Sequence, residues 1–226
     1  MDFGLAGKTA VVTGGSSNIG RAIAITLAKE GTNTIIADID EKSGQKVADL
    51  ITSEGGKAKV FKADVTDYDS VQALAKAVLD EFGAIDVWVN NVGWDDFKYF
   101  MDSKDHWDKI IDLNYRHYLN CMHIILPHMM EKKGGRIINI GSDAGRVGEF
   151  REAVYSGCKA GVIGLTKAVA KEVGRFQITI NVVCPTATLP PPEEMGGESM
   201  FSGRDEDHNA AALFPAEALA KLKKQH

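Results

Sequence analysis

The segment Lys8-Thr-Ala-Val-Val-Thr-Gly-Gly-Ser-Ser-Asn-Ile-Gly20 carries the strongest fold signal in the chain. It begins as a short apolar run, passes through a glycine-rich turn and opens into a run with helical spacing over residues 21–30. Glycine lets the backbone approach a pyrophosphate, and the start of the helix offers free N–H groups and the positive end of its dipole. A strand, a glycine turn and a helix in this order therefore predict a dinucleotide site.

The next apolar run, residues 33–38, predicts a second strand that ends in a carboxylate, Asp38. A carboxylate roughly twenty residues beyond such a turn can hold both hydroxyls of an adenosine ribose. The same carboxylate would repel a 2′-phosphate, so Asp38 favours NAD over NADP. The alternative is a solvated acid at a strand end, which the upstream turn makes the weaker interpretation.

Strands and helices alternate along the rest of the chain. Further strands are expected at residues 57–62, 85–89, 136–140 and 177–183, and helices at residues 44–54, 68–83 with Asp67 as cap, 103–130, 153–176 and 216–224. This alternation implies right-handed crossovers and a parallel sheet covered on both faces. We therefore expect an α/β fold, in which a single doubly wound Rossmann domain holds a parallel sheet of about six strands.

Composition limits the class of protein. At 226 residues the chain fits one domain with one sizeable core. A net charge of -5 argues against a nucleic-acid or anionic-membrane surface, and no apolar run approaches a membrane span. With no secretory signal pattern and no disulfide framework among three cysteines, we expect a cytoplasmic protein.

A second segment, from Ser142 to Lys159, carries the candidate chemistry. Tyr155 and Lys159 are four residues apart at the start of a predicted helix, so both side chains leave on one face. A lysine ammonium beside a tyrosine favours the phenolate, and the pair can then exchange a proton with a substrate oxygen. Ser142, at the end of a strand, can donate a hydrogen bond to that oxygen. Alone, this spacing is equally consistent with a solvated helix face; the upstream nucleotide pattern favours catalysis.

Together these motifs resemble the short-chain dehydrogenase/reductase family, from Leu5 to about Pro185. The matching motifs are Thr13-Gly-x-x-x-Asn-Ile-Gly20, Asp64-Val, Asn90-Asn-Val-Gly93, Asn114, Ser142, Tyr155-x-x-x-Lys159 and Pro185. The runs at residues 93–100 and 142–155 are similar, more narrowly, to 2-hydroxycyclohexanecarboxyl-CoA dehydrogenases.

The resemblance implies a catalytic tetrad. Tyr155 would be the general acid/base, while Lys159 would lower the pKa of Tyr155 and hold the nicotinamide ribose. Ser142 would orient the substrate oxygen, and Asn114 would hold a water that relays protons to Lys159. The implied cofactor-binding residues are Tyr155 and Lys159 together with Gly14, Ser16, Asn18, Ile19, Gly20, Asp38, Asp64, Val65, Asn91, Gly93, Pro185 and Thr188.

Hydride would pass directly between NAD and a carbinol carbon, so the chemistry needs no metal. His117, His123 and His128 share one predicted helix but do not converge as zinc ligands would, so no metal site is expected. The expected substrate is a small secondary alcohol or ketone, cyclic or acyl-CoA-linked.

The end of the chain differs from the family pattern. Family members continue through another helix and a last strand, whereas residues 186–226 would supply a substrate lid and a truncated end. The alternative function is therefore a nucleotide-binding module with impaired catalysis, although the intact tetrad argues against it. A homodimer through the helices at residues 103–130 and 153–176, or a homotetramer, is expected.

Overall fold

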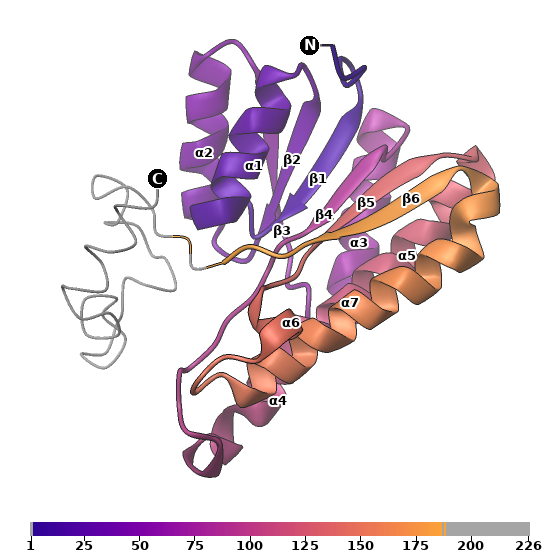
Figure 1. The fold of residues 1–226 in the computed structure, drawn as a ribbon. Helices are drawn as coiled ribbons and strands as arrows, with labels where there is room; N and C mark the ends of the chain where they lie inside the picture. Colours follow the sequence, from indigo (N-terminus) through magenta and orange to yellow (C-terminus); the bar gives the residue numbers. More distant parts are fainter. Residues whose placement is uncertain (1, 187, 189–226) are drawn as a thin grey trace. The chain divides into compact units, whose positions relative to one another are not determined.

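The computed structural model describes residues 2–186 and 188. It confirms the α/β prediction, since this part forms one six-stranded parallel sheet in the order β3-β2-β1-β4-β5-β6 (Figure 1). The strands are β1 (Thr9–Thr13), β2 (Asn33–Asp38), β3 (Lys57–Lys62), β4 (Val87–Asn90), β5 (Gly135–Ile140) and β6 (Ile178–Val183). The helices are α1 (Asn18–Lys29), α2 (Glu41–Ser53), α3 (Tyr68–Phe82), α4 (Trp107–Ile111), α5 (His117–Lys132), α6 (Ala144–Val147) and α7 (Ala153–Val173).

Helices cover both faces of the sheet, as the sequence predicts. Helices α1 and α2 lie on one face and α3, α5 and α7 on the other (Figure 1). Two apolar cores follow from this arrangement, one holding Ala24 and Ile51 from the first pair of helices, the other holding Leu74, Ile125 and Val162. Each core is lined by alternate residues of the same strands, because successive side chains of a strand point to opposite faces.

The register of the strands places the candidate site at the C-terminal ends of the parallel strands. Thr13 at the end of β1 pairs with Ala37 in β2, and Asn90 at the end of β4 pairs with Asn139 in β5. The loops that follow these strands therefore leave the sheet together. In open α/β sheets, ligands bind at the carboxyl ends of the strands where the strand order reverses, here between β1 and β4.

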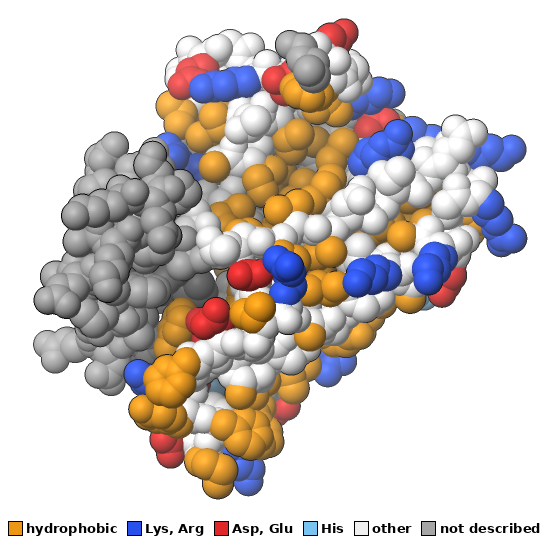
Figure 2. Space-filling view, in the orientation of Figure 1, with side chains coloured by type: hydrophobic (Ala, Val, Ile, Leu, Met, Phe, Trp, Pro, Cys, Tyr) orange, Lys and Arg blue, Asp and Glu red, His pale blue; other side chains and the backbone are white. Residues whose placement is uncertain are grey.

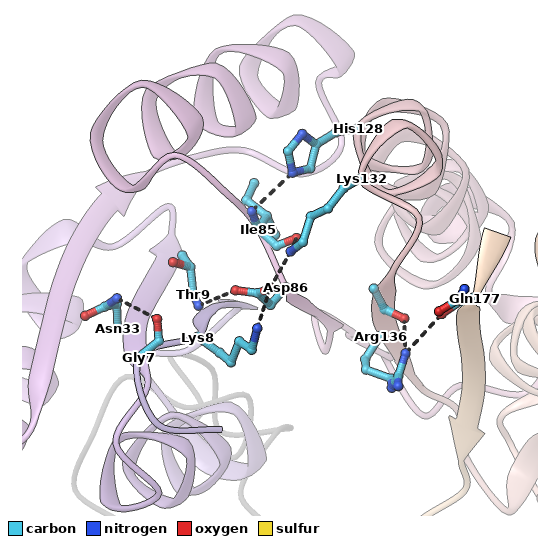
Figure 3. Close-up of polar contacts among 11 residues, drawn as sticks. Gly7, Lys8, Thr9, Asn33, Ile85, Asp86, His128, Lys132, Arg136 and Gln177 are labelled. Carbon is cyan, nitrogen blue, oxygen red and sulfur yellow. Dashed lines mark hydrogen bonds and ion pairs between the residues drawn. The ribbon is translucent and has the colours of Figure 1, made fainter. Parts of the chain in front are cut away.

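Asp86, which precedes β4, lies at the N-terminal ends of the strands and there links β1 to β4 (Figure 3). Its carboxylate accepts a hydrogen bond from the Thr9 backbone N–H at 2.9 Å and pairs with the ammonium groups of Lys8 and Lys132. Burial alone would raise the pKa of Asp86, but these bonds outweigh it and hold the pKa below its ordinary value. This network fixes β1 against β4 and lies away from the candidate site.

The predicted helix at residues 103–130 begins later than expected. Two short 3-10 turns, Phe100–Asp102 and Lys104–His106, precede α4. The Ser103 hydroxyl donates to the Phe100 carbonyl at 3.0 Å and accepts from the Trp107 indole N–H at 2.9 Å, so local side-chain bonds replace the first helical turn. A π-helical segment, Asp112–Arg116, then separates α4 from α5.

The last predicted helix of the core is also shorter than expected, because α7 ends at Val173 and continues only as the 3-10 turn Gly174–Phe176. The predicted helix at residues 216–224 lies outside the described residues. So does the predicted lid and shortened end at 186–226, apart from residues 186 and 188. Those expectations stay predictions.

Candidate active site

The glycine turn after β1 has the geometry that a close ligand requires. Gly14 has a φ of +62° and Asn18 a φ of 46°, the left-handed region that glycine and asparagine tolerate best. A Cβ added at Gly20 would lie 2.0 Å from the Gly14 carbonyl oxygen, so no other residue fits there. The N-cap residue of α1, Ser17, makes no side-chain capping bond to the first turn of the helix.

Asp38 is held beside this turn by two backbone hydrogen bonds. One carboxylate oxygen accepts a hydrogen bond from the Ser16 backbone N–H at 3.1 Å, and the other accepts from the Asp40 N–H at 3.0 Å. The carboxylate is therefore fixed where β2 ends, next to the residues predicted to line a pyrophosphate. Its predicted contact with the adenosine ribose stays a prediction.

Asn91 ties the end of β4 to the glycine turn. Its side-chain amide donates to the carbonyls of Thr13 at 3.0 Å and Gly14 at 3.2 Å, while its backbone N–H donates to the Thr13 hydroxyl. These bonds hold the loop after β4 against the loop after β1, at the point where the strand order reverses. The structure thus gives Asn91 a role in building the turn, beside its predicted place near the adenosine.

Three more of the predicted cofactor residues, Asp64, Val65 and Pro185, follow the ends of strands of the same sheet. Asp64 follows β3, where its carboxylate accepts from the Thr66 N–H and hydroxyl, and Val65 is buried. The Pro185 carbonyl accepts from the Asp143 N–H at 2.9 Å, which joins the loops after β5 and β6. The Thr188 hydroxyl donates to the Thr186 carbonyl at 3.1 Å. Its predicted contact with the nicotinamide stays a prediction.

Tyr155 and Ser142 are brought together. Tyr155 stands in the first turn of α7 and Ser142 follows β5, and their side chains share a hydrogen bond. Burial raises the pKa of Tyr155 to about 12; the bond to Ser142 lowers it, and the charges of Glu152 and Asp95 raise it further. Desolvation of the phenolate is the largest of these effects. The expectation that Lys159 lowers the pKa of Tyr155 stays a prediction.

Lys159 is almost fully buried behind Tyr155. Its ammonium donates to the Tyr118 hydroxyl at 2.9 Å and to the Ile140 carbonyl at 3.0 Å. It lies 5.5 Å from the centroid of the Tyr155 ring. Burial lowers the pKa of Lys159 to about 7, so the side chain changes its charge near neutral pH. The lysine is thus placed beside the tyrosine but bonded to a different hydroxyl.

Asn114 lies in the π-helical segment and is fully buried. Its amide accepts from the Trp94 backbone N–H and donates to the carbonyls of Trp94 and Ile110. A Cβ added at Gly93 would come within 3.0 Å of the Asn114 side-chain oxygen and 3.4 Å of the Lys159 ammonium. The lack of a side chain at Gly93 therefore leaves space beside both Asn114 and Lys159. The predicted tetrad and its water relay stay predictions.

Two carboxyl groups near Tyr155 were missed by sequence reasoning. Asp95 is 3% exposed, and one of its oxygens has no hydrogen-bond partner among the described residues. Burial raises the pKa of Asp95 to about 7, and burial together with the charges of Asp95 and Glu149 does the same for Glu152. Asp95 stands two residues after the Asn-Asn-Val-Gly motif, a position that only knowledge of its burial would have singled out.

Tyr118 and His117 were also missed. Tyr118 stands four residues after Asn114, one turn further along the chain, which is the one signal in the sequence that could have pointed to it. His117, equally buried, bonds through Nε2 to the Val92 carbonyl at 3.0 Å, and its Nδ1 has no partner among the described residues. The histidines predicted not to bind metal have separate contacts, since His123 bonds to Tyr68 and His128 to the Ile85 N–H.

Within residues 2–186 and 188, no three histidine, cysteine, aspartate or glutamate side chains converge as metal ligands. No helix in the same ranges is long and apolar enough to cross a membrane.

The described residues fit a dinucleotide. The turn at Gly14 and Gly20 leaves no room for a side chain, the uncapped start of α1 follows it, and Asp38 is fixed at the end of the neighbouring strand. The tetrad residues lie beyond the ends of β4 and β5, on the other side of the strand-order reversal. A dinucleotide that lies across the C-terminal ends of the strands would reach from Asp38 to Tyr155.

Residues 8–195 match the family model described as short chain dehydrogenase. The chain belongs to this family of oxidoreductases. It is 41% identical over 181 residues to the 3-oxoacyl-(acyl-carrier-protein) reductase FabG of Staphylococcus aureus, covering 79% of this chain and 73% of that one. The corresponding reductase of Vibrio cholerae is 40% identical over 182 residues, with 80% and 73% covered. A crystal structure of NAD+-bound xylitol dehydrogenase superposes with a TM-score of 0.80 at 29% identity, covering 83% of this chain and 73% of that one.

Proposed function

We propose that this protein transfers a hydride between NAD(H) and a secondary alcohol or ketone that is part of an acyl thioester. The observation that carries the proposal is the assembly of Ser142, Tyr155 and Lys159 at the carboxyl edge of the sheet, across the strand-order reversal from Asp38. The nicotinamide, when bound, supplies or accepts the hydride. The residues of the chain then handle only the proton and the orientation of the substrate.

Tyr155 acts as the general acid when a ketone is reduced. With a pKa of about 12 it keeps its proton at neutral pH, so it can donate that proton to the substrate oxygen as the carbonyl carbon receives the hydride. Ser142 donates a second hydrogen bond to the same oxygen and stabilises the charge that develops there. Lys159, with a pKa of about 7, can return a proton to the phenolate. Oxidation of the alcohol reverses each transfer.

The substrate class follows from two resemblances that share one chemistry. The curated relatives are named for a 3-oxoacyl group, whose ketone stands two bonds from the thioester carbonyl carbon. The narrower motif resemblance is to dehydrogenases of 2-hydroxycyclohexanecarboxyl-CoA, whose hydroxyl stands at the same distance in a ring. We propose a β-hydroxyacyl or β-ketoacyl thioester, with the cyclic substrate as the narrower candidate.

An apolar surface supports an acyl substrate. Figure 2 shows hydrophobic side chains gathered at the end of the molecule that carries α4. Tyr99 and Phe150 are exposed aromatic residues whose rings meet edge to face with their centroids 5.5 Å apart, and the Arg151 guanidinium lies over the Tyr99 ring. Phe150 is 74% exposed and belongs to the segment that leads into α7, the helix that carries Tyr155.

The test is a substrate panel followed at the absorbance of the reduced nicotinamide. Linear β-ketoacyl thioesters, a cyclic β-ketoacyl thioester and simple ketones would each be assayed with NADH and NADPH, on coenzyme A and on an acyl carrier protein. Turnover of thioesters well above simple ketones supports the proposal. If the protein binds the dinucleotide but turns over no ketone, the result would support the alternative function, a nucleotide-binding module with impaired catalysis.

We predict that NAD is preferred over NADP and that Asp38→Ala narrows the preference. The carboxylate is fixed by Ser16 and Asp40, so it would face the 2′-phosphate of NADP at close range. Removing it abolishes that repulsion and also a ribose acceptor, so affinity for NAD should fall while affinity for NADP rises. Dissociation constants of both dinucleotides would be measured by calorimetry.

The control for this prediction is Glu54→Ala, which removes an exposed carboxylate at the end of α2. It should leave the ratio of the two dissociation constants unchanged. A wild-type protein that prefers NADP would overturn the assignment of Asp38.

A further inference from the structure

The Lys159 ammonium has two hydrogen-bond acceptors among the described residues, one on α5 and one on β5. Lys159 is 2% exposed, so its charge is solvated by the protein rather than by bulk water. Two acceptors receive its N–H groups: the hydroxyl of Tyr118 on α5 and the carbonyl of Ile140 at the end of β5. Tyr118 is fully buried and itself donates to the Ile140 carbonyl at 2.6 Å, which fixes the direction of its hydroxyl lone pairs.

The other titratable groups that face Lys159 do not replace these acceptors. Cys158 and Tyr155 face it from α7, His117 faces it from α5, and Cys184 faces it from the segment after β6. None of these is a carboxylate. His117 is buried with its pKa lowered to about 3 by burial and by the charge of Lys159, so it stays neutral. The charged lysine therefore depends on one hydroxyl and one carbonyl.

We propose that Tyr118 is a positioning residue of the active site, whose hydroxyl holds the Lys159 side chain against the end of β5 and stabilises its protonated form. A hydroxyl accepts a stronger hydrogen bond from an ammonium than from a neutral amine. Burial already shifts the proton equilibrium of Lys159 toward the neutral amine, so the loss of one of two acceptors shifts it further. Without the Tyr118 hydroxyl, Lys159 would therefore be protonated, and able to return a proton to Tyr155, only at lower pH than in the wild type.

The placement of Tyr118 explains why Lys159 is not bonded to Tyr155. Two of the three ammonium donors point into the interior, which leaves the third for the polar space beside Gly93 and Asn114. A shorter side chain at position 118 would leave the Lys159 ammonium with the Ile140 carbonyl alone. Tyr118 thus acts through Lys159 and touches neither the reacting carbon nor the hydride.

The test compares Tyr118→Phe with the wild type. The phenyl ring keeps the packing against the His117 ring, whose centroid lies 4.0 Å from that of the Tyr118 ring, and only the hydroxyl is lost. The protonation of Lys159 would be followed by NMR of lysine labelled at Cε, with its resonance assigned by its loss in Lys159→Met. We expect the midpoint to fall by about one pH unit, the tenfold change typical of a hydrogen bond to a charged group. The midpoint of the pH profile of kcat/KM should fall with it.

The matched control is Tyr115→Phe, three residues earlier in the same helical run, where the ring packs over Gly161. Its hydroxyl is not one of the two acceptors that Lys159 bonds to among the described residues. It should leave both midpoints unchanged. If Tyr118→Phe does not fold, a fluorotyrosine at position 118 offers a weaker acceptor of nearly the same size and should produce a smaller shift in the same direction.

This proposal rests on the proposed function only through the catalytic role of Lys159. An unmoved NMR midpoint in a folded Tyr118 variant overturns the positioning role even if the enzyme turns over thioesters. A lowered NMR midpoint in a protein that reduces no ketone retains that role and overturns the proposed function instead.

Discussion

Tyr155→Phe is expected to reduce kcat for ketone reduction by about 10²–10⁴-fold, the range typical of a lost general acid. The variant keeps the ring and loses only the proton donor that shares a hydrogen bond with Ser142. Dinucleotide affinity should be nearly unchanged, because the glycine turn and Asp38 belong to other elements. Stopped-flow measurement of hydride transfer and calorimetry of dinucleotide binding check the two halves of this prediction.

The pH profile separates Tyr155 from its neighbours. Since its pKa is about 12, Tyr155 itself stays protonated across the range in which the enzyme can be assayed. A change in rate near pH 7 would therefore report on Lys159, Asp95 or Glu152, whose pKa values lie at about 7. Tyr68→Phe, which removes an exposed hydroxyl bonded to His123, serves as control and should keep full activity. Substantial turnover by Tyr155→Phe would show that another group donates the proton.

The fold could be predicted because its signals are local. The bounds of β2 and β3 agree with the predicted strands, and α3 begins after Asp67 and ends at Gly83 as its capping residues indicate. Its four predicted apolar positions, from Val71 to Val78, are all buried. The late start of α4 could not be predicted, because it depends on side-chain bonds of Ser103 with Phe100 and Trp107 that compete with helical bonds.

The candidate site was predictable only in part. The spacing of Tyr155 and Lys159 predicts that both leave one face of a helix, and both are buried near Ser142. It does not predict that the lysine bonds to Tyr118, which stands 41 residues earlier, nor that burial raises the pKa of Tyr155. Both facts depend on how the helices pack over the sheet, and a periodic pattern carries no information on the distance between elements.

His117 should make the protein sensitive to acid. Its pKa is lowered from an ordinary value of 6.5 to about 3, first by burial and then by the charge of Lys159. Between these two values the unfolded chain binds a proton at this position and the folded chain does not, so the free energy of unfolding decreases as the pH falls. Each pH unit across this window costs about 1.4 kcal/mol, and the whole window on the order of several kcal/mol. That is a large share of the roughly 5–15 kcal/mol by which domains are stable.

We therefore expect His117→Gln to flatten the pH dependence of stability between pH 6.5 and about 3. Glutamine carries no charge at any of these pH values and keeps an amide donor for the Val92 carbonyl that now bonds Nε2. Urea unfolding at several pH values gives the free energy for wild type and variant, and contributions from carboxylates such as Asp86 cancel in the difference. The control is His123→Gln on the same helix, where the side chain is exposed and bonded to Tyr68; its curve should follow the wild type. Parallel curves for His117→Gln and the wild type would mean that His117 gains its proton without unfolding the protein, and that Lys159 tolerates a second charge beside it.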